Sequence, residues 1–503
     1  MNIQPINKLF QDLQKLRIQA SKLGWTQYTT GFDFGIDEAY KKITNFLEDE
    51  NNFKIICDYK EKELDPFDKR RVEIAYNTFE PYHKSKEINE LNLKIRKKTT
   101  ELSKILNTFR FKYDGKEITS VEIDQILANE EDRNIRRKVY FVRNQINHVL
   151  VENGFIELIN LRKELAKANE SKDFVEYMLK REELNSNIFD NWKSELNDHI
   201  QLLNNKRREY AQQYLKSESL ESWDESYVKA QISPSLRAKV DMSGYYIILR
   251  NFFSNFGFNL DNFNIVYDIF PRKAKSEWGY NFTIEKGKDS RILANVKNQY
   301  SEYRTLLHES GHAIHSFLQD PNEIILNAGI SGIITEGIAN LFGSFIFDKL
   351  FYKNFFDNNV EEEFKNIEEY EKLNYIRFIG NIFFDHELYR NNIESLDDIY
   401  NLYFKVYSEL FGDKPTAEEI PFGYRIHYTT HPIYMHNYFM GDVTAEMLKK
   451  VFCQRQNIKN VSEKSKEFGE FLISEIIKPS GFYKYEDLFK RISGNNFSIK
   501  WYF

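Results

Sequence analysis

The chain has 503 residues, enough to bury a large core, and its 21 Gly and 10 Pro form no linker-like stretch, so we expect one continuous body. Its 70 basic and 76 acidic residues are interspersed and give a net charge of −6, which excludes the basic stripe that nucleic-acid binding requires. No run of 18 apolar residues and no apolar signal region occurs, so we expect a cytoplasmic protein without a membrane partner. The two cysteines, Cys57 and Cys453, predict no disulfide framework.

Apolar residues at helical spacing dominate the first part of the chain. We expect helices over residues 4–23, 36–49, 64–80, 86–111, 120–128, 131–170 and 186–216. Gly24 should end the first helix, and residues 113–116 should form a turn. No catalytic group of residues stands out in this part. We therefore assign residues 1–215 to a helical N-terminal lobe that forms a cleft wall and lid, and residues 216–503 to the catalytic lobe of one continuous fold.

The β-strand signal is confined to residues 263–296, which follow a predicted helix over 236–257. Three short runs there are rich in Ile, Val, Tyr and Phe, and Pro271 and Gly287 bound them. They predict a small sheet immediately before residues 303–320. A further helix is expected over residues 360–376. The fold class is therefore mainly α.

Residues 303–320 carry a candidate metal site. His308 and His312 are four residues apart, so both imidazoles lie on one face of a helix. Glu309 completes an H-E-x-x-H match, in which the Glu reaches a water on the metal. This pattern predicts a zinc-binding helix. The alternative is a helix whose histidines are merely hydrogen-bonded in a core.

A third ligand is expected because catalytic zinc takes three protein ligands and keeps one position open. Glu336 is the one acid between Asn327 and Asp348, and it stands in an apolar helical run. A lone carboxylate there is costly to bury unless it is paired or bound to a metal. We predict that Glu336 is the third ligand. The alternative is a surface Glu on an amphipathic helix.

The two motifs resemble a known family. HESGHAIHSFL, which begins at His308, resembles the H-E-x-G-H-x-x-H signature of the thimet oligopeptidase and oligoendopeptidase F family. That family uses a Glu as the third zinc ligand, about as far downstream of the signature as Glu336 is here. TEGIANLF, around Glu336, is similar to a helix of angiotensin-converting enzyme, a related zinc peptidase. Residues 383–410 look like a segment of oligoendopeptidase F, which implies a helix–helix turn at 391–395. The resemblance, strongest over 263–450, implies a two-lobed helical body with a deep central channel and a small β-sheet beside the zinc helix.

A second patch, residues 420–442, is rich in His and Tyr. Amide hydrolysis needs hydrogen-bond donors where charge develops on the carbonyl oxygen. The family carries a His and then a tyrosine-rich helix here, which implies His427 and Tyr438 as these donors and Tyr434 as a substrate contact or alternate donor. Angiotensin-converting enzyme has a basic residue two positions before the His that binds the substrate's terminal carboxylate. Arg425 is therefore a candidate anchor, with an ordinary salt bridge as the alternative.

The substrate is expected to lie beside an edge strand, as in zinc peptidases of this kind. Similarity to the segment before the zinc helix of angiotensin-converting enzyme implies that Ala274–Trp278 is that strand. Ser276, Glu277 and Trp278 would then contact the peptide.

Together these residues predict a zinc metalloendopeptidase that cuts oligopeptides and holds one Zn²⁺ per chain. Glu309 would take a proton from the attacking water and pass it to the leaving amine. Asn340 and His315 would orient the ligands. Two alternatives stay open: a (dipeptidyl) carboxypeptidase that uses Arg425, and a catalytically idle peptide-binding protein. The oligomeric state is left open.

Overall fold

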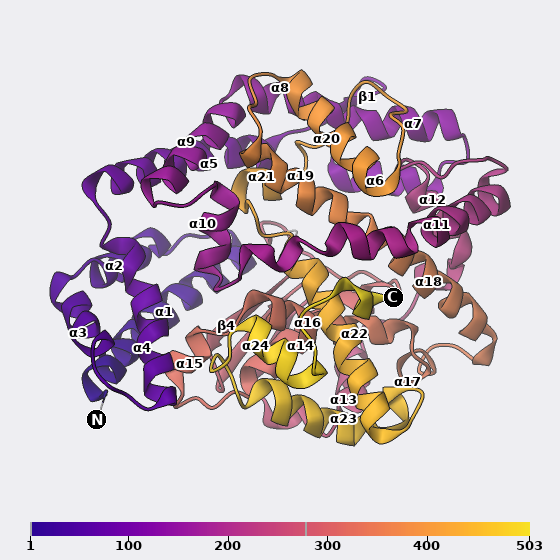
Figure 1. Cartoon of the computed structure of the whole chain (residues 1–503). Coiled ribbons are helices and arrows are strands. Elements are labelled where there is room, and N and C mark those ends of the chain that lie inside the picture. The colour runs from indigo at the N-terminus through magenta and orange to yellow at the C-terminus, as the bar shows by residue number, and fades with distance from the viewer. Residues whose placement is uncertain (1–2, 277–278) are drawn as a thin grey trace.

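A computed structural model describes residues 3–276 and 279–503 and is mainly helical (Figure 1). The N-terminal elements are α1 (Gln4–Thr30), α2 (Ile36–Leu47), α3 (Glu50–Lys60), α4 (Pro66–Phe79), α5 (Lys86–Thr108), β1 (Phe111–Tyr113), β2 (Lys116–Ile118), α6 (Ser120–Asn129), α7 (Arg133–Phe141), α8 (Gln145–Glu152), α9 (Phe155–Ala168), α10 (Phe174–Arg181) and α11 (Trp192–Tyr210). There follow α12 (Glu225–Ile232), α13 (Tyr245–Ser254), β3 (Ile265–Asp268), β4 (Tyr280–Glu285), β5 (Asp289–Leu293), α14 (Glu302–Phe317), α15 (Ile324–Ala328), α16 (Gly332–Ser344), α17 (Lys349–Tyr352), α18 (Glu361–Ile376), α19 (Phe378–Arg390), α20 (Leu396–Phe411), α21 (Ile426–Thr430), α22 (His436–Gln456), α23 (Ser465–Leu472) and α24 (Tyr485–Ser493).

Helix α1 continues past Gly24, where the sequence predicted its end. Gly24 lies inside the helix, and a Cβ there would be 3.8 Å from the ring of Phe282. The next turn presents Trp25, whose ring packs edge-on against Phe282 at 5.6 Å. Burial against β4 therefore outweighs the low helix propensity of glycine. The helix ends at Gly31, which has φ 77°.

The long stretch predicted to be helical over residues 131–170 is helical but not continuous. The chain there forms α7, α8 and α9, and Gly154 has φ 99° immediately before α9, a conformation that only glycine adopts without strain. The predicted turn at residues 113–116 joins β1 to β2. Asp114 and Gly115 both have positive φ there, as a tight hairpin requires.

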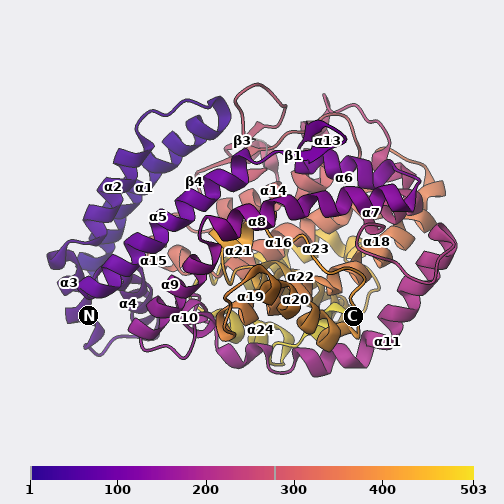
Figure 2. The ribbon, with the colours of Figure 1, turned by 90° about the horizontal axis from the view of Figure 1, so that it is seen from above.

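Helices α1–α4 pack around an apolar cluster of their own, which includes Ile325 and Leu326 of α15. Helix α3 was not predicted from the sequence. The main apolar core spans from Ile88 to Tyr502 and so joins residues on both sides of position 215. Figure 2 shows α5 to α8 lying across α14, α16 and α22. The segment 383–410 forms α19 and α20, with the expected turn between them.

The small sheet has the order β3–β5–β4, with β3 parallel and β4 antiparallel to β5. β3 and β4 are both edge strands, and β4 is the one that packs beside α14. The prediction that Ala274–Trp278 forms the edge strand is wrong for its described part. Ala274 has φ 67° in a turn, and Ser276 lies in irregular chain. Glu277 and Trp278 lie outside the described residues.

A buried lysine explains this turn. The ammonium of Lys275 donates hydrogen bonds to the backbone oxygens of Asp268, Phe270 and Ala294 at 2.5–2.9 Å. Satisfying three carbonyls with one side chain folds residues 268–275 around the ammonium, which an extended strand could not do.

A cavity of about 630 Å³ lies between the N-terminal helices and the catalytic helices. Asp124, Leu127 and Tyr140 line one side, and His308 and Tyr438 line the other. This agrees with the predicted helical body with a central channel. Across residues 3–276 and 279–503, the structure has no helix of the length and apolarity needed to cross a membrane.

Candidate active site

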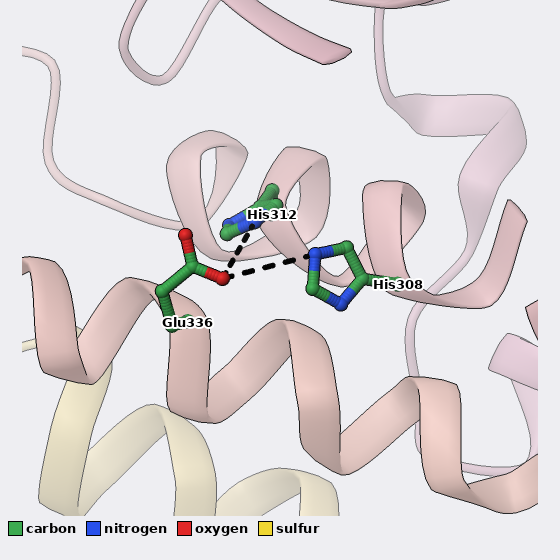
Figure 3. Close-up of side chains that lie close together, drawn as sticks. All are labelled: His308, His312 and Glu336. Atoms are coloured by element: carbon green, nitrogen blue, oxygen red, sulfur yellow. Dashed lines mark ion pairs between the residues drawn. The ribbon is translucent and has the colours of Figure 1, made fainter. Parts of the chain in front are cut away.

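Helices α14 and α16 bring His308, His312 and Glu336 together (Figure 3). The Oε2 atom of Glu336 lies 3.9 Å from the Nε2 atoms of both histidines. One ligand atom from each of the three residues lies within 4.8 Å of the others. Two imidazoles and one carboxylate are the donor set of a known class of catalytic zinc site, so the group fits one small divalent cation.

Glycines allow the supporting helices to approach this closely. A Cβ on Gly311 of α14 would lie 3.0 Å from the Cα of Ala339 on α16. Gly337 of α16 and Gly441 of α22 face each other, and a Cβ on Gly441 would lie 3.1 Å from the Cβ of Glu336. A side chain at these positions would therefore push Glu336 away from the histidines.

Burial keeps the candidate ligand histidines neutral. Desolvation, followed by the positive charge of Arg304, lowers the pKa of His308 to about 4. Desolvation likewise holds the pKa of His312 well below its usual range. Neutral imidazoles are the form that binds metal, so both side chains are prepared as ligands at neutral pH.

The two acids at the site lack a counter-charge. Desolvation and then the charge of Asp442 raise the pKa of Glu336 to about 7. Desolvation and then Glu336 raise the pKa of Glu309 to about 8. A divalent cation held by Glu336 and the histidines would supply the missing positive charge. The uncompensated carboxylates therefore point to a cation at the same place as the two imidazoles and the carboxylate do.

Asn340 and His315, which were predicted to orient the ligands, have different neighbours in the structure. The amide of Asn340 lies within hydrogen-bonding reach of His308 and of the carboxyl of Asp442. His315 instead contacts Gln319, with 3.3 Å between its Nε2 and the amide nitrogen. Asp442 was not among the residues predicted from the sequence, although its place one turn after Tyr438 on α22 puts both on one helix face.

The second patch, residues 420–442, forms one cluster of rings beside His308, His312 and Glu336, the three residues of the metal group. The Nε2 of His427 on α21 lies 3.4 Å from the hydroxyl of Tyr438 on α22. The rings of Tyr434 and Tyr438 meet edge-on at 5.4 Å. Burial and then the charge of Glu336 raise the pKa of Tyr438 to about 12, so its hydroxyl stays protonated and can donate a hydrogen bond. Burial is also the main cause that lowers the pKa of His427 to about 4.

Arg425 lies in the same cavity as His308 and Tyr438. Its guanidinium lies 5.5 Å from the ring of Tyr424 and forms no salt bridge with a carboxylate in the described parts of the chain. The ordinary salt bridge that the sequence left open is therefore not formed there. Ser276 acts through its backbone, with its N–H donating to the oxygen of Tyr28 and its oxygen accepting from Asn295.

The start of β4 approaches the candidate base. A Cβ on Gly279 would lie 3.7 Å from the Oε1 of Glu309 and 3.3 Å from Thr305. The half-exposed ring of Tyr280 follows, and the charge of Glu309 contributes to raising its pKa, after burial and Tyr28. This contact was not predicted from the sequence, because the edge strand was expected at residues 274–278, before Gly279.

Comparisons with known proteins agree with this geometry. The sequence model described as Peptidase family M3 matches residues 261–498, which include both parts of the site. Among proteins with curated descriptions, none matches the chain.

Three solved structures illustrate the fold likeness. PZ peptidase A, solved with an inhibitor, has a TM-score of 0.71 and 17% identity over 99% of this chain and 94% of its own. A structure described as an oligoendopeptidase F has a TM-score of 0.70 and 16% identity over 99% and 94% of the two chains. An M32 carboxypeptidase from Deinococcus radiodurans has a TM-score of 0.64 and 14% identity over 99% and 96%. At these identities the likeness shows the shared fold.

Proposed function

We propose that this chain, of which residues 261–498 match the sequence model described as Peptidase family M3, is a zinc-dependent endopeptidase of oligopeptides. The observation that carries this proposal is the convergence of His308, His312 and Glu336 beside Glu309. The chain would hold one Zn²⁺. Peptides would reach it through the cavity between the N-terminal helices and the catalytic helices.

The chain's own side chains can perform each proton step. A bound zinc ion would supply Lewis-acid activation of the attacking water. Glu309, buried beside the ligands, would accept a proton from that water and return it to the leaving amine. The raised pKa of Glu309 lies in the range where a group both accepts and releases a proton readily. A nearby cation would lower this pKa toward about 7.

Tyr438 lines the same cavity as His308, and His427 lies against Tyr438. A neutral His427 carries one ring N–H, and the protonated Tyr438 carries an O–H. Both can donate hydrogen bonds to the oxygen on which negative charge develops, which stabilises the transition state more than the ground state. Tyr434, in edge contact with Tyr438, would be a substrate contact or alternate donor. Asn340 would orient His308.

A second candidate function, cleavage near a free carboxyl terminus, is favoured by one observation. Arg425 lines the cavity without a carboxylate partner among the residues described. A guanidinium can hold a carboxylate through two parallel hydrogen bonds, so a peptide's terminal carboxylate would complete this pairing. The chain would then act as a (dipeptidyl) carboxypeptidase.

Two measurements test the main proposal. The purified chain should contain one zinc per chain by elemental analysis, and it should cleave a quenched fluorescent peptide in a way that a chelator abolishes and added zinc restores. Zinc content without cleavage of any member of a peptide library would instead support a catalytically idle peptide-binding protein.

The organisation of the chain is part of the same proposal. Residues 1–215 would provide one wall and the lid of the cleft, and residues 216–503 the catalytic lobe. A cytoplasmic location, with oligopeptides as partners, completes it.

A further inference from the structure

A second cavity, of about 380 Å³, lies where α1 and α2 meet the end of β4 and α15. These four elements are neighbours in both views of the ribbon (Figures 1 and 2). Its described lining contains none of the residues proposed above for peptide hydrolysis. Its size falls within the range of roughly 300–1,000 Å³ that is typical of small-molecule sites.

Two cations from distant parts of the chain share this cavity. Arg17 comes from α1, and Lys286 follows β4. The ammonium of Lys286 donates a hydrogen bond to the backbone oxygen of Asn327. Within residues 3–276 and 279–503, neither cation forms a salt bridge, and Arg17 forms no hydrogen bond. Each is therefore free to accept an anionic partner.

The two charges are close enough to affect each other. Burial and then the charge of Arg17 lower the pKa of Lys286 to about 8. The surrounding protein also lowers the pKa of Arg17, although its side chain stays accessible at the edge of the cavity. Two cations that repel each other destabilise the empty cavity, and an anion between them would relieve that repulsion.

The nearby carboxylates are already committed elsewhere. Glu285 is the sole acid in the described lining, and its Oε1 lies 2.6 Å from the Nζ of Lys288. Glu323, next to α15, binds Arg71 at 2.8 Å. Among the described residues there is therefore no internal counter-ion for the pair of Arg17 and Lys286.

The remaining walls are largely apolar and suit a small organic body. They comprise Phe10, Ile18, Ala20, Ile43, Ile284, Pro321 and Ile324. Gln14, Ser21 and Tyr40 add polar side chains that have no hydrogen-bond partner in the described chain. A site with one charged end and an apolar wall selects an amphipathic anion over an inorganic one.

We propose that this cavity binds a small organic carboxylate with an apolar body, with the carboxylate between Arg17 and Lys286. The guanidinium offers a planar fork and the ammonium a point charge, so both carboxylate oxygens find a donor. The bound acid connects α1 to the end of β4, which the backbone joins to α14 through the Gly287 N–H and the Ser316 oxygen at 3.0 Å. A free aliphatic acid and the carboxyl end of a short apolar peptide share this chemistry.

Titration calorimetry on the full chain tests the site. The probes are octanoate, N-acetyl-leucyl-leucine and the amide of that peptide, with acetate as a control that lacks an apolar body. We expect at least one of the two acids to bind, the amide to bind at least tenfold more weakly than the free peptide acid, and acetate to bind more weakly than octanoate. Octanoate as the tighter acid would identify a free aliphatic acid as the source, and the peptide acid as the tighter one would identify a peptide terminus.

The affinities of variants show whether the acid binds in this cavity. Arg17→Gln and Lys286→Gln should each weaken binding at least tenfold, Arg17→Lys should restore part of it, and Lys15→Gln, an exposed position on the same helix, should leave it unchanged. Because Arg17 is accessible, its variants should fold even if Lys286→Gln does not. The double variant His308→Ala/His312→Ala should retain binding, since the metal group is not involved.

Three results would overturn the proposal: no binding of either acid at millimolar concentration, unchanged affinity in both Arg17→Gln and Lys286→Gln, or loss of binding in the double histidine variant. Equal affinity for acetate and octanoate would remove the apolar body from the proposal. The assay needs no turnover, so its outcome is independent of whether the chain hydrolyses peptides.

Discussion

The buried carboxylate of Asp385 on α19 accepts a 2.8 Å hydrogen bond from the backbone N–H of Ile433. Ile433 has φ 54°, a strained conformation for a β-branched residue, and it lies in the loop between α21 and α22. Arg162 of α9 donates to the oxygens of Tyr428 and Thr429 at the end of α21. These three hydrogen bonds hold the end of α21 and the loop that follows it, and so set His427 of α21 against Tyr438 of α22.

We therefore expect Asp385→Ala to lower kcat at least tenfold while the zinc content and KM stay close to those of the wild type. The N–H of Ile433 would lose its acceptor, a change worth about 1–3 kcal/mol in a buried position. Asp385→Asn keeps an acceptor oxygen and should restore most of kcat. If Asp385→Ala lowered the free energy of unfolding but left kcat unchanged, the contact would support folding alone.

The metal group gives the second prediction. His308→Ala, His312→Ala and Glu336→Ala should each lose zinc affinity by more than about 100-fold, since even residues that only support ligands contribute 10–100-fold. Elemental analysis after dialysis measures the loss, and cleavage of a quenched peptide should fall with it. His148→Ala, at an exposed position of α8, is the matched control. Full zinc occupancy in Glu336→Ala would show that another residue is the third ligand.

Glu309→Gln removes the proposed base and keeps the shape of the side chain. We expect zinc content and melting temperature to stay near wild type and kcat to fall by about 10²–10⁴, the usual contribution of general acid–base catalysis. Single-turnover kinetics on a quenched peptide measures this change. Activity within a few-fold of wild type would exclude Glu309 as the base.

Arg425 decides between the two candidate functions. If it holds the terminal carboxylate, amidation of one peptide substrate should lower kcat/KM at least tenfold, about 1.4 kcal/mol, in the wild type. The same amidation should cost Arg425→Ala much less, because the anchor is already gone. Equal cleavage of free and amidated peptides by the wild type would remove the anchor role and leave an endopeptidase.

His427 gives a prediction about stability and pH. Its pKa is lowered to about 4 in the folded chain, against about 6.5 when unfolded, so the unfolded state binds more protons between these values. The stability that the neutral ring contributes is complete above pH 6.5 and is lost as pH falls toward 4. Urea unfolding of the chelator-treated chain should therefore show a smaller loss between pH 7 and pH 5 in His427→Gln than in the wild type. Parallel losses in both proteins would contradict the lowered pKa.

The sequence by itself determined the chemistry of the metal group. The spacing of His308 and His312 fixes both rings on one helix face, and a lone Glu336 in an apolar run has few other uses, because burying it unpaired is costly. The pairing of His427 with Tyr438 was implied by the resemblance to the family and not by spacing. The sequence also indicated the helical class and the small sheet. These features depend on local spacing or on the cost of burying a charge, which a linear sequence records.

The tertiary structure decided what depends on distant contacts. Gly24 does not end α1 because Trp25 packs on Phe282. Residues 274–276 form a turn and irregular chain instead of an edge strand because Lys275 gathers three carbonyls. The support of Ile433 by Asp385 and the meeting of Arg17 with Lys286 join residues far apart in sequence. No local pattern encodes such pairs, since each arises only when separate helices pack against each other and bury polar groups that must find partners.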